Sequence, residues 1–77
     1  MNYYVIEQIN ATGNGRLTTI VLVTNLKIEA GAIHATKVGE VDWERSDKKY
    51  VFNHAEPTDF FIIGNATCEE IKNPFGE

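Results

Sequence analysis

The chain has 77 residues, which allows one domain with a thin stability margin, because a chain this short buries only about 60–65% of its unfolded surface. Eleven acids against seven bases give a net charge of −4, which argues against a nucleic-acid surface, since such surfaces are normally basic. Cys68 is the only cysteine, which excludes an intrachain disulfide and fits a reducing compartment, and no apolar run approaches the roughly 20 residues of a membrane-spanning helix. We therefore expect one soluble, cytoplasmic domain over 1–77, without membrane contact.

The N-terminal third predicts a β-hairpin. Residues 3–10 and 16–24 are rich in aromatic and β-branched side chains, which suit a pleated surface. Asn14-Gly15 lies between them, and Asn-Gly is the preferred pair for a type I′ turn, whose two central residues need positive φ. A turn at this pair places Ile9 opposite Ile20 and Ile6 opposite Val23.

Two short segments, Ile20–Val23 and Phe60–Ile63, are apolar at every position and so present apolar side chains on both faces of a strand. A strand of this kind is central in its sheet or is covered on each face. Because one small core has little chain with which to cover both segments, we expect the protein to self-associate, as a two-fold dimer.

Residues 40–53 predict a second hairpin with its turn at Ser46-Asp47. This register pairs Val41 with Phe52 and Trp43 with Tyr50, and it places Glu44 opposite Lys49. Aromatic pairs and opposite charges facing each other stabilise a hairpin by roughly 0.2–1 kcal/mol each. A shift of one residue would scatter the two faces, so the pattern supports this register.

The middle of the chain admits two interpretations. Residues 25–38 fit either a strand bent at Gly31 and Gly39, which we favour, or a helix capped near Asn25. Near the C-terminus, Thr67 and Glu70 have the spacing of a capping box, which predicts one helical turn at 68–72. The expected fold is mostly β, an antiparallel sheet of five to six strands curled into a barrel or sandwich. The alternative is an α+β fold with a helix near 25–38 packed on the sheet.

The sequence contains no recognisable catalytic or metal-binding motif. His34 and His54 are the only histidines, and neither they nor Cys68 show the paired spacing of a zinc site. We therefore expect no enzyme activity, no catalytic residues, no metal and no cofactor.

The candidate binding residues lie in the second predicted hairpin. Aromatic side chains beside basic ones are typical of protein-binding and base-stacking surfaces, and this group comprises Trp43, Arg45, Lys48, Lys49 and Tyr50. The interpretation that we favour for the two rings places Trp43 and Tyr50 in the core, because a domain of this size needs its aromatic side chains inside. The acidic residues alternate along one predicted strand and would share one face, namely Glu40, Asp42 and Glu44. Such a row suits a basic partner surface, but protection of an exposed strand edge is the interpretation that we favour.

These features favour a non-enzymatic binding module or small inhibitor that acts through a protein–protein surface, of the kind that phages and plasmids encode. The alternative is a small-molecule or nucleotide binder that sequesters its ligand in a pocket between protomers, lined by Trp43, Tyr50 and basic residues. Single-stranded nucleic-acid binding ranks third, because the net charge opposes it.

Overall fold

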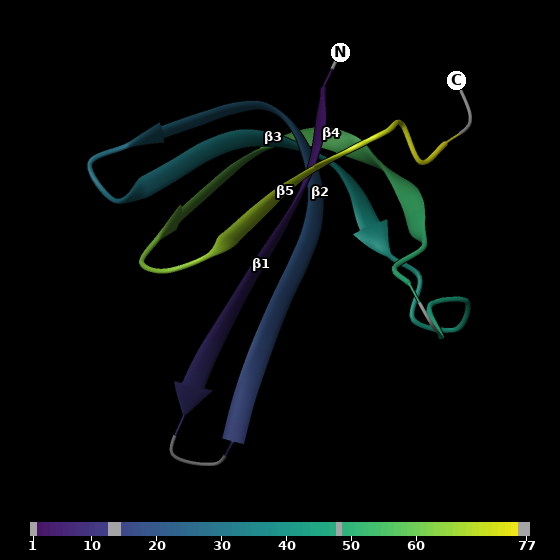
Figure 1. The fold of residues 1–77 in the computed structure, drawn as a ribbon, viewed down its shortest axis with the longest axis horizontal. Helices are drawn as coiled ribbons and strands as arrows, with labels where there is room; N and C mark the ends of the chain where they lie inside the picture. Colours follow the sequence, from purple (N-terminus) through teal and green to yellow (C-terminus); the bar gives the residue numbers. More distant parts are fainter. Residues whose placement is uncertain (1, 13–14, 48, 76–77) are drawn as a thin grey trace.

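The protein is one open, antiparallel β-sheet. The computed structural model describes residues 2–12, 15–47 and 49–75, and this part of the chain contains five strands and no helix (Figure 1). The strands lie in the order β4-β3-β2-β1-β5. Their bounds are Tyr3–Thr12 for β1, Gly15–Glu29 for β2, Ala32–Val41 for β3, Phe52–Ile63 for β4 and Thr67–Ile71 for β5. The prediction of a mostly β, five-stranded antiparallel sheet is therefore confirmed.

The first hairpin is present, but its register differs from the prediction. Ile6 lies opposite Val21, and Ile9 lies opposite Thr18, so the pairing is shifted by two residues. The last pair is Thr12 with Gly15, and the predicted turn residue Asn14 lies outside the described residues. Because side chains alternate with a period of two, this shift leaves every side chain on its predicted face.

The middle of the chain forms a further hairpin, and the predicted helix near 25–38 is wrong. β2 continues to Glu29, and the chain then reverses at Ala30 and Gly31, whose φ angles are 52° and 77°. Two successive positive φ angles are typical of a type I′ turn, the connection that matches the twist of a hairpin. The strand interpretation was correct, but Gly31 lies in a complete reversal of the chain instead of a bend.

Gly39 allows a close approach between neighbouring strands. It is buried in β3, where a Cβ atom would lie 3.1 Å from the Cβ atom of Leu22 and 3.2 Å from the carbonyl oxygen of Asn53. The register also shifts here, because Val38 is an extra residue between Lys37 and Gly39. A second irregularity follows Thr24 in β2, where Asn25 has a φ of 54°. Such bulges increase the local twist of a sheet and so promote its curling.

The connection between β4 and β5 requires the sheet to curl strongly. These strands form the two outer edges of the sheet, yet only residues 64–66 separate them. In a flat sheet the edges would lie roughly 19 Å apart, at four spacings of about 4.8 Å. The four-residue step from Ile63 to Thr67 spans at most about 14 Å. The two edges must therefore approach each other at this end of the sheet.

The curl stops short of a closed barrel, so the predicted barrel or sandwich is wrong. No ladder joins β4 to β5 in the described part of the chain, and one sheet contains all five strands. At this gap the side chain of Gln8 in β1 donates a hydrogen bond from Nε2 to the carbonyl oxygen of Ile63, at 2.9 Å. A side chain thus joins β1 to the end of β4 where a closed barrel would use backbone pairing.

Each face of the central strand β2 carries its own apolar cluster. Val21 and Val23 pack on one face with Ile6, Ile33 and Ala35. On the other face Ile20 and Leu22 pack with Phe52, and partly buried side chains from the strand ends and the C-terminal segment cover them. The expectation that a two-faced apolar strand is central or covered on each face is confirmed for Ile20–Val23, which is buried within a single chain. It is wrong for Phe60–Ile63, which lies in the edge strand β4 with Phe61 and Ile63 exposed.

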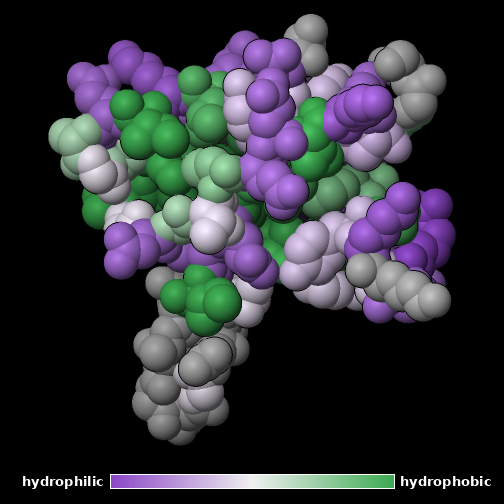
Figure 2. All heavy atoms as spheres, in the orientation of Figure 1, coloured by the Kyte–Doolittle hydropathy of each residue, from purple (hydrophilic) through white to green (hydrophobic). Residues whose placement is uncertain are grey.

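Apolar surface remains exposed at the end of the sheet that carries the β2–β3 turn and the β4–β5 connection, called the far end below. Ile28 in β2 is 62% exposed, and Phe61 and Ile63 in β4 are 52% and 70% exposed. In Figure 2, green apolar side chains show over the part of the molecule that carries the β2–β3 turn and the β4–β5 connection. β4 is an edge strand, so this exposed apolar surface lies beside an unpaired strand edge.

Candidate functional site

The predicted site lies mainly in the loop between β3 and β4, residues 42–51. The predicted pair Val41 with Phe52 is present and is the last pair of the β3–β4 ladder. Beyond it, one backbone hydrogen bond runs from the amide of Asp42 to the carbonyl of Val51, at 2.7 Å. The predicted register is thus correct, whereas the prediction that strand pairing continues to a turn at Ser46-Asp47 is wrong.

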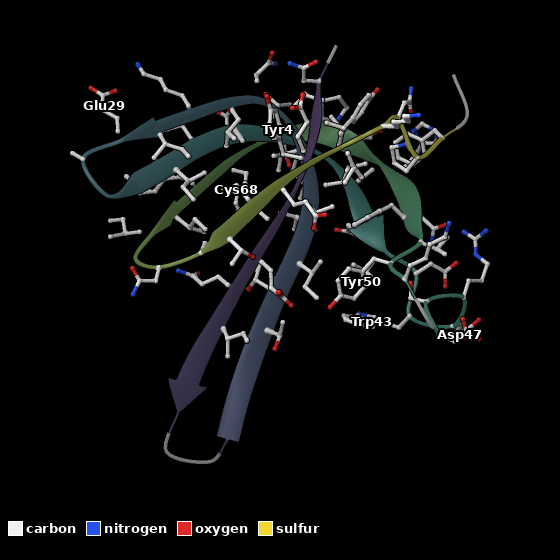
Figure 3. All side chains as sticks on the ribbon, in the orientation of Figure 1. Tyr4, Glu29, Trp43, Asp47, Tyr50 and Cys68 are labelled. Atoms are coloured by element: carbon white, nitrogen blue, oxygen red, sulfur yellow. The ribbon has the colours of Figure 1, made fainter. Side chains whose placement is uncertain are left out.

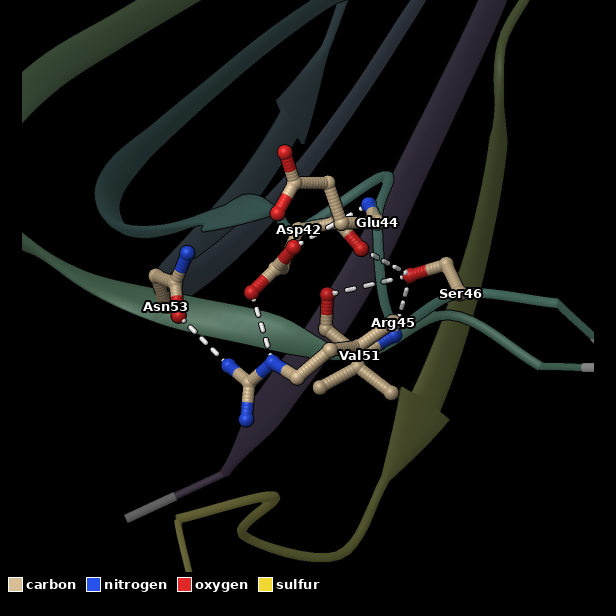
Figure 4. Close-up of polar contacts among 6 residues, drawn as sticks. All are labelled: Asp42, Glu44, Arg45, Ser46, Val51 and Asn53. Atoms are coloured by element: carbon tan, nitrogen blue, oxygen red, sulfur yellow. Dashed lines mark hydrogen bonds and ion pairs between the residues drawn. The ribbon is translucent and has the colours of Figure 1, made fainter.

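Side-chain hydrogen bonds end the ladder and hold the loop (Figure 4). The Asp42 carboxylate accepts a hydrogen bond from the Glu44 amide at 3.1 Å, which is an Asx turn. The Ser46 hydroxyl donates to the Asp42 carbonyl at 2.7 Å and accepts from the Val51 amide at 2.8 Å. These local bonds compete with strand pairing for the same backbone groups, which explains why the strands stop at Val41 and Phe52.

Arg45 links this loop to the start of β4. Its Nε atom donates to the Asp42 carboxylate at 2.6 Å, and its Nη2 atom donates to the Asn53 side-chain oxygen at 2.7 Å. The Arg45 guanidinium holds the pKa of Asp42 below its ordinary value, mainly through this hydrogen bond. Asp42 therefore stays ionised at neutral pH and keeps Arg45 oriented across the base of the loop.

Trp43 and Tyr50 contact each other on this loop and are exposed. Their ring centroids lie 6.0 Å apart at an interplanar angle of 86°, an edge-to-face arrangement. Figure 3 shows the two side chains next to each other at the loop. The predicted pair is therefore confirmed, but Trp43 is 63% and Tyr50 is 42% exposed, so neither ring belongs to the core. Exposed aromatic rings held in a fixed geometry are typical of protein-binding surfaces.

Tyr50 also connects the loop to β1. Its hydroxyl group donates a hydrogen bond to Oε2 of Glu7, at 3.3 Å. Partial desolvation, followed by the negative charge of Glu7, raises the pKa of Tyr50 above its ordinary value. Tyr50 therefore remains a neutral hydrogen-bond donor well into the alkaline range.

A groove lies between this loop and the β1–β5 pair. Its volume is about 810 Å³, within the range of ligand pockets. Its apolar lining comes from β1, the loop, the start of β4, β5 and the C-terminal segment, and includes Val5, Tyr50, Phe52, Ile71 and Pro74. Its described charged side chains are three carboxylates, Glu7, Asp47 and Glu69, and one ammonium group, Lys49. Among the described residues the groove is therefore acidic.

The structure separates the predicted acidic row. Only Glu40 lies in a strand, where it forms an ion pair with Lys37 at 2.5 Å. Asp42 is bound to Arg45, and Glu44 lies exposed in the loop, so the three residues do not line one face of a strand. Lys48 lies outside the described residues. Of the predicted site residues, Lys49 and Tyr50 line the groove, and Trp43 contacts Tyr50 without belonging to the lining.

The remaining reactive side chains are dispersed. His34 contacts the ring of Phe61, His54 stacks on Phe75 with centroids 3.6 Å apart, and Cys68 lies exposed in β5. Partial desolvation of the Cys68 thiol raises its pKa, which lowers its reactivity at neutral pH. In the described part of the chain, no group of three or more acidic, histidine or cysteine side chains is placed to hold a metal ion. The same part contains no helix that could cross a membrane.

Sequence reasoning missed the residues that complete the groove. Glu69 and Ile71 belong to β5, which the prediction replaced with a helical turn at 68–72. Ser46 was assigned to a turn, although it binds both sides of the loop. An aspartate at a strand end, followed by a serine four residues later, was the available signal for a loop closed by side chains.

Comparison of the chain with protein-family models, curated proteins and solved structures found no match.

Proposed function

We propose that the protein is a non-enzymatic binding module that acts through a protein–protein surface formed by the 42–51 loop and the adjoining groove. The observation that carries this proposal is the exposed Trp43–Tyr50 pair on a loop fixed by side-chain hydrogen bonds. Tryptophan and tyrosine are the residues most enriched among binding hot spots, and a preorganised loop loses little conformational entropy on binding.

The charges around this surface favour a basic partner. Glu7, Asp47 and Glu69 line the groove beside a single described ammonium group, that of Lys49. Carboxylates in a partly enclosed groove attract cationic side chains and disfavour phosphates. This argues for a basic protein surface and against a nucleic acid or a nucleotide as the ligand.

Affinity capture from a lysate of the source organism tests the proposal with a matched pair of variants. Trp43→Ala removes the aromatic anchor, whereas Ile28→Ala truncates a side chain of equal exposure at the far end of the sheet. Loss of a hot spot lowers affinity by roughly 30-fold, so a stoichiometric partner should disappear with Trp43→Ala and remain with Ile28→Ala. Equal recovery by both variants, or no stoichiometric partner at all, would contradict the proposal.

A small-molecule binder is the second candidate, and the volume of the groove favours it. The acidic lining selects a cationic ligand such as a polyamine over a nucleotide. A thermal-shift screen separates the two candidates, because a ligand at 100 times its Kd raises the free energy of unfolding by about 2.7 kcal/mol. Stabilisation by a polyamine that is unaffected by Trp43→Ala would support the small-molecule function.

We also propose that the protein self-associates, through β4. Ile20–Val23 is buried within one chain and contributes nothing to this argument. Phe61 and Ile63 remain exposed on an edge strand, and such edges pair readily with a second strand. Antiparallel pairing of two β4 strands about a two-fold axis would cover both side chains.

A further inference from the structure

We infer that the groove binds a basic, extended segment of the partner, which adds as a strand to the free edge of β5. This inference rests on the proposed function, because it specifies how the same surface recognises its protein partner. It has three parts, namely the charge of the groove, the open edge of β5 and the alternation of side chains along that strand.

Two of the three carboxylates of the groove lie on one face of the β1–β5 pair. Glu69 lies directly opposite Val5, and Glu7 lies opposite Thr67 in the same ladder. Residues opposite each other in an antiparallel pair share a face, as do residues two apart in one strand. Glu7 and Glu69 therefore both face the groove, and both contribute to its lining.

Tyr50 provides an aromatic surface beside these carboxylates. Its ring lines the groove, and its hydroxyl group donates to Glu7. A lysine or arginine side chain that enters the groove can contact a carboxylate and the face of an aromatic ring together, which stabilises a cation in a partly desolvated site. Apolar lining from Val5 and Ile71 suits the neighbouring side chains of such a segment.

β5 offers an edge to which a strand can add. It is the last strand in the sheet order, so in the described part of the chain only β1 pairs with it. A peptide that pairs with the other edge of β5 gains main-chain hydrogen bonds, and every second side chain falls on the groove face. Those side chains would lie beside Thr67, Glu69 and Ile71, which predicts a basic residue near Glu69 and an apolar residue near Ile71.

Alternation along β5 supplies a matched pair of variants. Glu69 lies on the groove face, whereas Glu70 lies opposite Tyr4 and therefore on the other face. Glu69→Lys and Glu70→Lys change the net charge by the same amount at adjacent positions, and both side chains are exposed. If the partner binds through general electrostatic attraction, the two variants should weaken binding equally. If one of its side chains binds in the groove, only Glu69→Lys should weaken binding.

An NMR titration tests the inference with the capped octapeptide Thr-Lys-Thr-Val-Thr-Lys-Thr-Val, which places lysine and valine in turn on one face of a strand. The octapeptide Thr-Glu-Thr-Val-Thr-Glu-Thr-Val is the control probe. We expect the basic peptide to shift the backbone amide signals of Thr67–Ile71 and Lys49–Phe52. We expect Glu69→Lys to weaken binding by about tenfold and Glu70→Lys to leave it within about twofold. No shifts at millimolar peptide, or equal loss with both variants, would overturn the inference.

The same variants distinguish this inference from the proposed function. A protein partner whose capture requires Trp43 but is unaffected by Glu69→Lys would refute strand addition at β5 and leave the binding module intact. Loss of capture with Glu69→Lys, together with retention by Glu70→Lys, supports both.

Discussion

Ser46 allows the most direct energetic test of the loop, because one hydroxyl group joins its two sides. Ser46→Ala removes the 2.7 Å bond to the Asp42 carbonyl and the 2.8 Å bond from the Val51 amide. Each hydrogen bond contributes about 0.5–1.5 kcal/mol, and water can reach these partly buried groups, so we expect a loss of about 1–2 kcal/mol in the free energy of unfolding. For a domain of this size that corresponds to a fall in Tm of about 5–15 °C.

Thermal unfolding followed by far-ultraviolet circular dichroism measures this loss, and the fluorescence anisotropy of Trp43, the only tryptophan, reports the order of the loop. Ser46→Ala should lower the Tm and the anisotropy together. Ser46→Thr retains a hydroxyl group and should recover most of both. If the Tm of Ser46→Ala lies within about 2 °C of the wild type, the hydroxyl group does not hold the loop and the reasoning is wrong.

Three further predictions follow from other parts of the molecule. Ala30 has a φ of 52°, which costs an L-residue about 1–2 kcal/mol, whereas glycine adopts this conformation freely but adds about 0.4–1 kcal/mol of chain entropy to the unfolded state. Ala30→Gly should therefore raise the free energy of unfolding by about 0.5–1 kcal/mol. Urea unfolding measures this change, and a lower midpoint for the variant would contradict the prediction. The lowered pKa of Asp42 means that its contribution to stability is present above its unfolded pKa of about 3.9 and is lost as the pH falls through the folded value. The change in Trp43 fluorescence on acidification should therefore be smaller in Asp42→Asn than in the wild type. An equal change in the two proteins would count against the Arg45 contact. Sedimentation should show a dimer for the wild type and a monomer for Ile63→Lys, with Ile9→Lys as an equally charged control; an 8.6 kDa wild-type monomer would refute pairing through β4.

The features that the sequence predicted well are those set by neighbouring residues. The alternating pattern around residues 41–52 was sufficient to predict that Val41 pairs with Phe52 and that Trp43 contacts Tyr50. The β-branched run after the first turn identified the central strand. The predicted register of this strand was wrong by two residues. A shift of two leaves every side chain on the same face of the sheet, so the side-chain pattern alone cannot exclude it.

The features that it did not predict depend on local exceptions or on distant pairing. The β2–β3 turn was missed because alanine rarely adopts positive φ, and Ala30 does so here. β5 was mistaken for a helical turn because Thr67 and Glu70 have capping-box spacing, whereas pairing with β1, sixty or more residues earlier, decides its structure. The groove exists only once that pair forms opposite the 42–51 loop, so no local pattern indicates it.

Amide hydrogen exchange on the chain, free and bound to its captured partner, tests the binding surface most directly. The account predicts that binding slows exchange in the 42–51 loop and in Thr67–Ile71. Exchange should keep its free rate in the paired segments Ile9–Thr12 and Gly15–Thr18 of the β1–β2 hairpin and around Ile28. Slowed exchange confined to β4 or to those hairpin segments, with the loop and β5 unchanged, would contradict the account.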